Sequence, residues 1–98
     1  MKMFVLNEDA GLDGVLPDGA EWCVQWYEAG SYEGNGTAYA GNSKGEYWTT
    51  GLGHCSCYGP CDDVSQWDKI TLSDLKMHLI GDTQGFVEKI REEGLADI

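Results

Sequence analysis

Residues 22–50 read WCVQWYEAGSYEGNGTAYAGNSKGEYWTT, and this stretch has the pattern of a small antiparallel sheet. In its first segment Trp22, Val24 and Trp26 would share one face of a strand, with the residues between them on the other face. The sequence EGNG at residues 33–36 favours a type I′ hairpin turn, and GNSKG at residues 41–45 is a second cluster of turn residues. We therefore predict a three-stranded antiparallel meander over about residues 22–50.

The C-terminal third of the chain has helical periodicity instead. Two apolar stripes recur at helical spacing, one formed by Leu72, Leu75 and Leu79 and the other by Phe86, Val87 and Ile90. Thr71 is placed to cap the first helix, with Asp74 at its third position. Asp82 or Thr83 is placed to cap the second helix, and Gly94 to end it. We predict helices over about residues 72–80 and 84–93.

These elements predict an α+β fold in a single domain spanning residues 1–98. Residues 2–6 are a candidate fourth strand, so the meander is expected to have three or four strands. Residues 8–21 are rich in glycine and acidic residues, which is typical of an irregular surface connection. A meander needs at least one covered face, and the two helices are expected to pack against it.

The start of the chain bears on its location. The apolar run at residues 3–6 is followed at once by Asn7-Glu8-Asp9, so it is too short for the core of a signal peptide. No apolar run approaches the roughly 20 residues that span a bilayer. We expect a cytoplasmic protein that does not enter a membrane, with its thiols reduced.

The charge balance is strongly acidic and uneven. Seventeen acidic residues against six basic ones give a net charge of −11, and no basic residue lies between Lys2 and Lys44. A field of this sign repels nucleic acid and anionic membranes, and it accelerates association with basic partners. Direct nucleic-acid binding is therefore not expected, although acidity also serves solubility.

A cysteine-rich segment follows the predicted meander. Cys55, Cys57 and Cys61, with His54 or the distant Cys23, would supply the four ligands of a structural zinc site. The spacing is C-x-C-x3-C, which is less diagnostic of zinc than two C-x2-C pairs. The sequence therefore leaves zinc as an alternative.

Two other interpretations of this segment stay open. Cys55 and Cys57 can be small buried side chains in a crowded turn, which Gly59-Pro60 then reverses. Alternatively, one of them is a nucleophile with His54 as base and Asp62 or Asp63 as orienting carboxylate. The nearby aspartates would raise a thiol pKa, and no basic residue lies between Lys44 and Lys69 to lower it. A raised thiol pKa disfavours catalysis. We favour the packed turn.

Two segments resemble a group of small uncharacterised proteins encoded by bacteriophages. The shared features are a Tyr-Glu-Gly-x-Gly hairpin at residues 32–36 and a Gly-His-Cys-Ser-Cys-Tyr-Gly-Pro turn at residues 53–60. The position of Cys61 is often aromatic in that group, which implies that Cys61 is dispensable and favours the packed turn over zinc. The resemblance implies expression in the cytoplasm of an infected bacterium. The positions that it marks as important are Tyr32, Glu33, Gly34, Gly36, His54, Cys55, Cys57, Tyr58 and Pro60.

From these observations we expect a non-catalytic accessory protein that binds and modulates a host or defence protein through a basic surface on that partner. Imitation of the nucleic-acid phosphate backbone is one way to inhibit such a partner. No cofactor is expected, and the chain is expected to be a monomer or a small homo-oligomer. The alternatives are a structural zinc domain using His54, Cys55, Cys57 and Cys61, a thiol enzyme, and an aromatic sheet that binds a small ligand. The residues expected to contact the partner are Glu28, Tyr32, Glu33, Asp62 and Asp63.

Overall fold

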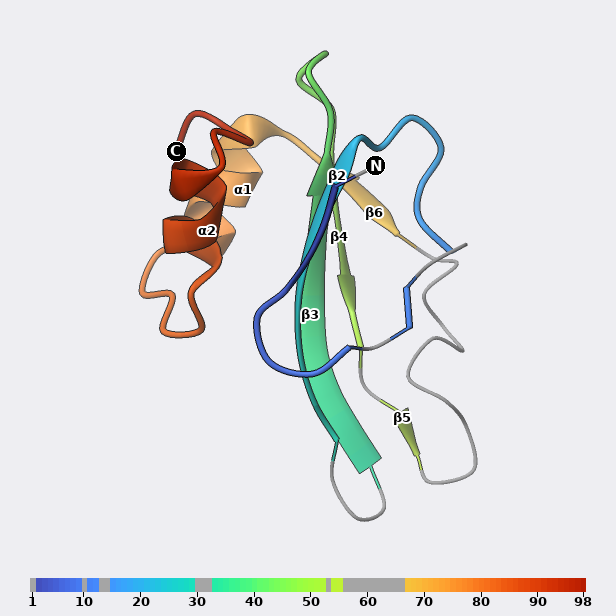
Figure 1. Ribbon diagram of the computed structural model, residues 1–98. Coiled ribbons are helices and arrows are strands. Elements are labelled where there is room, and N and C mark those ends of the chain that lie inside the picture. The colour runs from blue at the N-terminus through green and yellow to red at the C-terminus, as the bar shows by residue number, and fades with distance from the viewer. Residues whose placement is uncertain (1, 10, 13–14, 30–32, 53, 56–66) are drawn as a thin grey trace.

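The computed structural model describes residues 2–9, 11–12, 15–29, 33–52, 54–55 and 67–98. Within these residues one sheet is followed by two helices (Figure 1). The strand order is β1-β2-β3-β4-β6, and the short β5 pairs with β3 outside this path. The predicted α+β class is confirmed. The elements are β1 (Lys2–Val5), β2 (Trp22–Ala29), β3 (Glu33–Gly41), β4 (Tyr47–Gly51), β5 (His54–Cys55), β6 (Asp68–Ile70), α1 (Leu72–His78) and α2 (Phe86–Glu92).

The predicted antiparallel meander is formed by β2, β3 and β4. Trp22 pairs with Gly41, and Gly41 pairs in turn with Tyr47. The alternation in β2 is also as predicted, because Trp22 and Val24 join one buried cluster and Cys23 joins another on the opposite face. The period-two pattern therefore identified both the strand and its two faces.

One of the two predicted turns is wrong. The EGNG segment lies within β3, where Gly34 pairs with Ala29 and Asn35 with Glu28. Residues 30–32, which connect β2 to β3, lie outside the described residues. Gly36 is required for another reason: a Cβ atom there would collide with the backbone carbonyl oxygen of Trp26. Its glycine serves the close approach of two strands rather than a turn.

The second predicted turn is confirmed, and Asn42 holds it together. The Oδ1 atom of Asn42 accepts hydrogen bonds from the N–H groups of Lys44 (3.0 Å) and Glu46 (3.1 Å). Its Nδ2 atom donates to the carbonyl oxygen of Gly19 and to Oε1 of Glu46, both at 2.9 Å. Gly45 adopts a φ of +84°, which favours glycine. One buried amide thus ties the β3–β4 turn to the segment before β2.

The N-terminal strand forms at Lys2–Val5, but it does not extend the antiparallel meander. It pairs with β2 in parallel, with Lys2 opposite Trp22 and Phe4 opposite Val24. A parallel pair requires a crossover connection, and the residues between β1 and β2 supply it. The strand β6, which the sequence did not predict, pairs with β4 in antiparallel orientation. Its three residues are too short to show alternation.

The two predicted helices are confirmed, with shorter bounds. A capping box begins α1: the N–H of Asp74 donates to Oγ1 of Thr71 (3.1 Å), and the N–H of Thr71 donates to Oδ2 of Asp74 (3.2 Å). Gly94 follows α2 with a φ of +64°, and the N–H of Leu95 donates to the carbonyl of Ile90 (2.9 Å). This is a Schellman C-cap. None of the described helices is long and apolar enough to cross a membrane.

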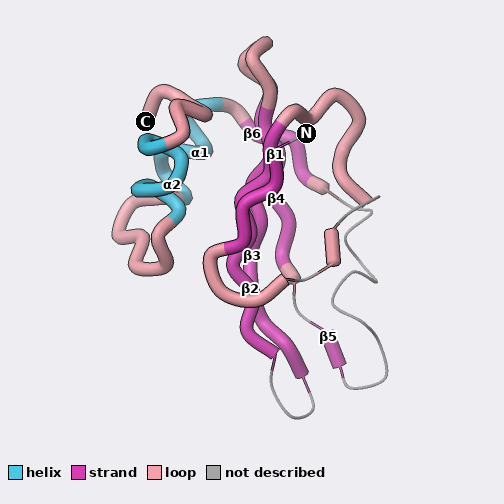
Figure 2. Tube along the Cα trace, in the orientation of Figure 1, coloured by secondary structure: helices cyan, strands magenta, loops and turns pink. Residues whose placement is uncertain are grey.

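Each face of the sheet is covered in part, and by a different segment of the chain (Figure 2). The helices cover one face and bury Trp22, Val24, Tyr39 and Tyr47 against Leu75, Leu79, Phe86 and Ile90. The connection before β2 covers the other face, where Leu12 is completely buried beside Cys23, Ala40, Trp48 and Leu52. The expectation that residues 8–21 form only a surface connection is therefore wrong: the segment is irregular, but it supplies one wall of the core.

Candidate functional site

The structure brings the two motif segments together at one end of the sheet. Strand β5 pairs with the start of β3, with Cys55 opposite Glu33 and His54 opposite Gly34. The end of β2 lies beside the same part of β3, because Ala29 pairs with Gly34. We call this region, which comprises residues 27–29, 33–35 and 54–55, the distal end of the sheet (Figure 1).

The predicted partner-binding residues can be placed only in part. Glu28 is exposed at the distal end, and Glu33 is the first residue of β3. Tyr32, Asp62 and Asp63 lie outside the described residues. Of the predicted zinc ligands, His54 and Cys55 form the backbone of β5, whereas Cys57 and Cys61 lie outside the described residues.

Two further acidic residues belong to this end, and the sequence did not assign them to it. Beyond β1 the chain continues beside β2: the N–H of Leu6 donates to the carbonyl of Gln25 (2.9 Å), and that of Glu8 to the carbonyl of Tyr27 (3.2 Å). The side-chain amide of Asn7 donates to the same Tyr27 carbonyl (2.8 Å). Exposed Glu8 is thereby placed beside Glu28, with exposed Asp9 next to it. Only the parallel pairing of β1 with β2 reveals this proximity.

None of the six basic residues of the chain is one of the residues of the distal end. Lys2 is opposite Trp22, and Lys44 lies in the β3–β4 turn, at the other end of the sheet. At about 3.3 Å per residue, Trp22 and Glu28 are about 20 Å apart along β2. The other four are Lys69 on β6, Lys76 on α1, and Lys89 and Arg91 on α2. No lysine or arginine therefore belongs to the distal end itself, and Nζ of Lys89 lies 5.5 Å from the centroid of the Phe4 ring on β1.

Acidic residues at the opposite end are engaged within the protein. Glu21 accepts a hydrogen bond from the backbone N–H of Ser43 (2.5 Å), which lowers the pKa of Glu21. Glu46 accepts hydrogen bonds from Lys69 and from the Asn42 amide, both at 2.9 Å, and these lower the pKa of Glu46. These carboxylates stabilise the turn.

Cys23 does not belong to the cysteine-rich segment. It pairs with Ala40 in the middle of the sheet, whereas β5 pairs with residues 33–34 of β3, about 20 Å farther along that strand. Its side chain is completely buried, and burial raises the pKa of the thiol to about 12. Cys23 is therefore an apolar core residue and not a fourth ligand beside Cys55.

We predict that Cys23 makes stability fall at alkaline pH. The folded thiol keeps its proton up to about pH 12, while an unfolded thiol loses it near pH 9. The stability that the protonated Cys23 thiol contributes is complete below about pH 9. It is lost as pH rises toward 12, and the free energy of unfolding then falls by up to about 1.4 kcal/mol per pH unit. In urea unfolding, the stability difference between wild type and Cys23→Ala should therefore shrink between pH 9 and 11. A difference independent of pH would contradict the prediction.

The zinc alternative remains a prediction. Among the described residues, no group of three or more histidine, cysteine or acidic side chains could hold a metal ion. Under the packed-turn interpretation, protein purified without chelator should contain less than about half an equivalent of zinc, and chelation should leave melting unchanged. One equivalent, with a lower melting temperature after chelation, would instead support the zinc alternative, for which His54, Cys55, Cys57 and Cys61 are the candidate ligands.

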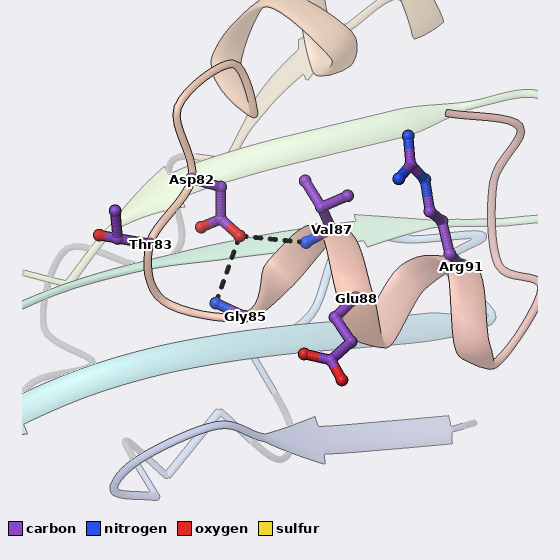
Figure 3. Close-up of a pocket in the computed structure, with 6 residues that line it drawn as sticks. All are labelled: Asp82, Thr83, Gly85, Val87, Glu88 and Arg91. Carbon is purple, nitrogen blue, oxygen red and sulfur yellow. Dashed lines mark hydrogen bonds between the residues drawn. The ribbon is translucent and has the colours of Figure 1, made fainter.

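An open groove of about 500 Å³ lies along α2 (Figure 3). Oδ2 of Asp82 accepts hydrogen bonds from the N–H groups of Gly85 and Val87, both at 3.2 Å, and so caps the helix. The prediction that Asp82 or Thr83 is the N-cap residue is wrong, because Gly85 occupies that position. Arg91 donates from Nε to the carbonyl of Ile98 (3.1 Å). Asp82 thus serves the start of α2 and Arg91 holds the C-terminal residue, which makes the distal end the stronger candidate site.

Comparisons with protein-family models, with curated proteins and with solved structures find no significant match to this chain.

Proposed function

We propose that this protein is a small acidic accessory protein of a bacteriophage that binds a basic surface on a host or defence protein and modulates that protein. In this role it binds and does not catalyse. The observation that supports the proposal most is the separation of charge: exposed Glu8, Asp9 and Glu28 gather at the distal end, and all six basic residues lie elsewhere.

The physical argument concerns both rate and specificity. A net charge of −11 attracts a basic surface over about one Debye length, which is about 8 Å at physiological salt. The distal end has exposed carboxylates and no lysine or arginine, and this asymmetry favours encounters in which the distal end arrives first. Basic sites that bind nucleic acid are suited to such a ligand, because they are built to neutralise phosphates. Nucleic-acid mimicry is therefore the form of inhibition that we propose.

The proposal is tested with immobilised protein and lysate of a host bacterium. We expect basic proteins to be retained at low salt, and to be released by moderate salt and by added nucleic acid. Retention of no protein at low salt, or retention that ignores salt up to high ionic strength, would contradict the electrostatic proposal.

Matched charge variants then locate the surface. Glu8→Gln combined with Glu28→Gln should weaken retention several-fold, because each exposed charge contributes about 0.2–1 kcal/mol. Glu88→Gln combined with Glu92→Gln changes the net charge equally on exposed positions of α2, and it should change retention much less. Equal effects of the two pairs would mean that the net charge matters and the distal end does not.

A further inference from the structure

The helices leave part of their face of the sheet open. Residues that share this face form rows across β2, β3 and β4, and the first two rows contain buried Trp22, Tyr47, Val24 and Tyr39. In the third row, Trp26 pairs with Thr37 and Thr37 with Gly51; Trp26 and Thr37 are half-buried, and Gly51 is exposed. In the fourth row, both Glu28 and its partner Asn35 are exposed. Coverage by the helices therefore ends at the third row.

Among the described residues, none stands over Gly51 in the third row. A Cβ atom built on Gly51 would have no neighbour within 4 Å. Thr37 is also small, so the half-buried indole of Trp26 has only small side chains beside it in this row. We call Trp26, Thr37, Gly51, Glu28 and Asn35 the open shelf. It combines part of an aromatic ring system with a carboxylate two residues away on the same strand face.

The charges around the open shelf select its occupant. Glu28 is exposed on this face, and no lysine or arginine belongs to the open shelf. An exposed carboxylate beside an indole attracts a cation, and arginine suits this pair best. Its planar guanidinium stacks on aromatic rings and donates two parallel hydrogen bonds to a carboxylate, whereas lysine offers a compact charge.

We propose that the open shelf receives an arginine side chain from a basic segment of the partner, with the guanidinium against Trp26 and paired with Glu28. This inference rests on the proposed function in that it takes the partner to be basic. It goes beyond that function by naming the residue that is recognised and the two side chains that recognise it.

The test uses short peptides of equal length and charge, one rich in arginine and one in lysine, with a citrulline peptide as the neutral control. By calorimetry at low salt, wild type should bind the arginine peptide about three-fold or more tighter than the lysine peptide and should not bind the citrulline peptide. Glu28→Gln should weaken arginine binding about three-fold or more. Glu88→Gln on α2 is the matched control, and it should leave binding nearly unchanged.

Trp26→Leu should remove the preference for arginine over lysine, and Trp26→Phe should keep part of it. Circular dichroism establishes that each variant is folded. A folded Trp26→Leu variant that retains the preference, or a wild type without one, would overturn the inference. If these variants still capture basic lysate proteins in a salt-sensitive way, the proposed function survives and the open shelf does not. If the peptide preferences hold but no lysate protein is retained, the arginine site stands and the proposed function fails.

Discussion

Gly36→Ala is expected to destabilise the protein by about 3 kcal/mol or more, a large part of the total stability of a domain this small. A Cβ atom at this position would collide with the carbonyl oxygen of Trp26 and lie 2.8 Å from Cα of Tyr27. Both contacts are with backbone, so relief requires β2 and β3 to separate where Gly36 pairs with Tyr27. Thermal unfolding followed by circular dichroism should show a melting temperature lower by about 15 °C.

Two other glycines provide a graded control for this prediction. At Gly41 a Cβ atom would lie 2.5 Å from Cζ2 of Trp22 and 2.8 Å from Cδ1 of Tyr47. Rings can shift where backbone cannot, so Gly41→Ala should cost less, about 1–3 kcal/mol. Gly51 has open space at this position, and Gly51→Ala should be neutral or slightly stabilising. If Gly36→Ala melts like Gly51→Ala, close strand approach at Gly36 is not a constraint.

Gly36 also illustrates where sequence-based prediction fails for this fold. An Asn-Gly pair is a strong hairpin signal because glycine tolerates positive φ, but a strand that must approach its neighbour closely uses glycine for its missing side chain. The two uses look the same in sequence. Strand alternation at residues 22–27 and the Thr71–Asp74 capping box were predicted correctly, because each is specified by residues a few positions apart.

Features that depend on distant residues could not be predicted in this way. Pairing of β1 with β2 joins Lys2 to Trp22, and β6 joins Lys69 to Trp48. Neither of these short strands has a sequence pattern that indicates which strand it pairs with. The same limit applies to the candidate site: Glu28 was expected there from its own neighbourhood, whereas Glu8 reaches the distal end only through the β1–β2 pairing.

Leu12→Ala is expected to destabilise the protein by about 2–4 kcal/mol, because it would leave a cavity under a completely buried side chain. Composition of the surrounding segment predicts a surface position with almost no effect, so this substitution separates the two interpretations. Met77→Ala removes a side chain that is 68% exposed, and it should change stability by less than about 0.5 kcal/mol. Urea unfolding measures the stability of both variants. Equal midpoints would show that Leu12 is not part of a buried core.

The stability lost through Leu12→Ala should combine differently with a second substitution, depending on which face of the sheet that substitution affects. Leu52 belongs to the same cluster as Leu12, whereas Ile90 belongs to the cluster under the helices. Because the sheet separates the two clusters, Leu12→Ala and Ile90→Val should add to within about 0.5 kcal/mol. Leu12→Ala and Leu52→Val remove atoms from the same buried cluster, so their combined loss should differ from the sum. Additivity in both pairs would mean that the segment before β2 does not complete the second core, even if Leu12→Ala alone is costly.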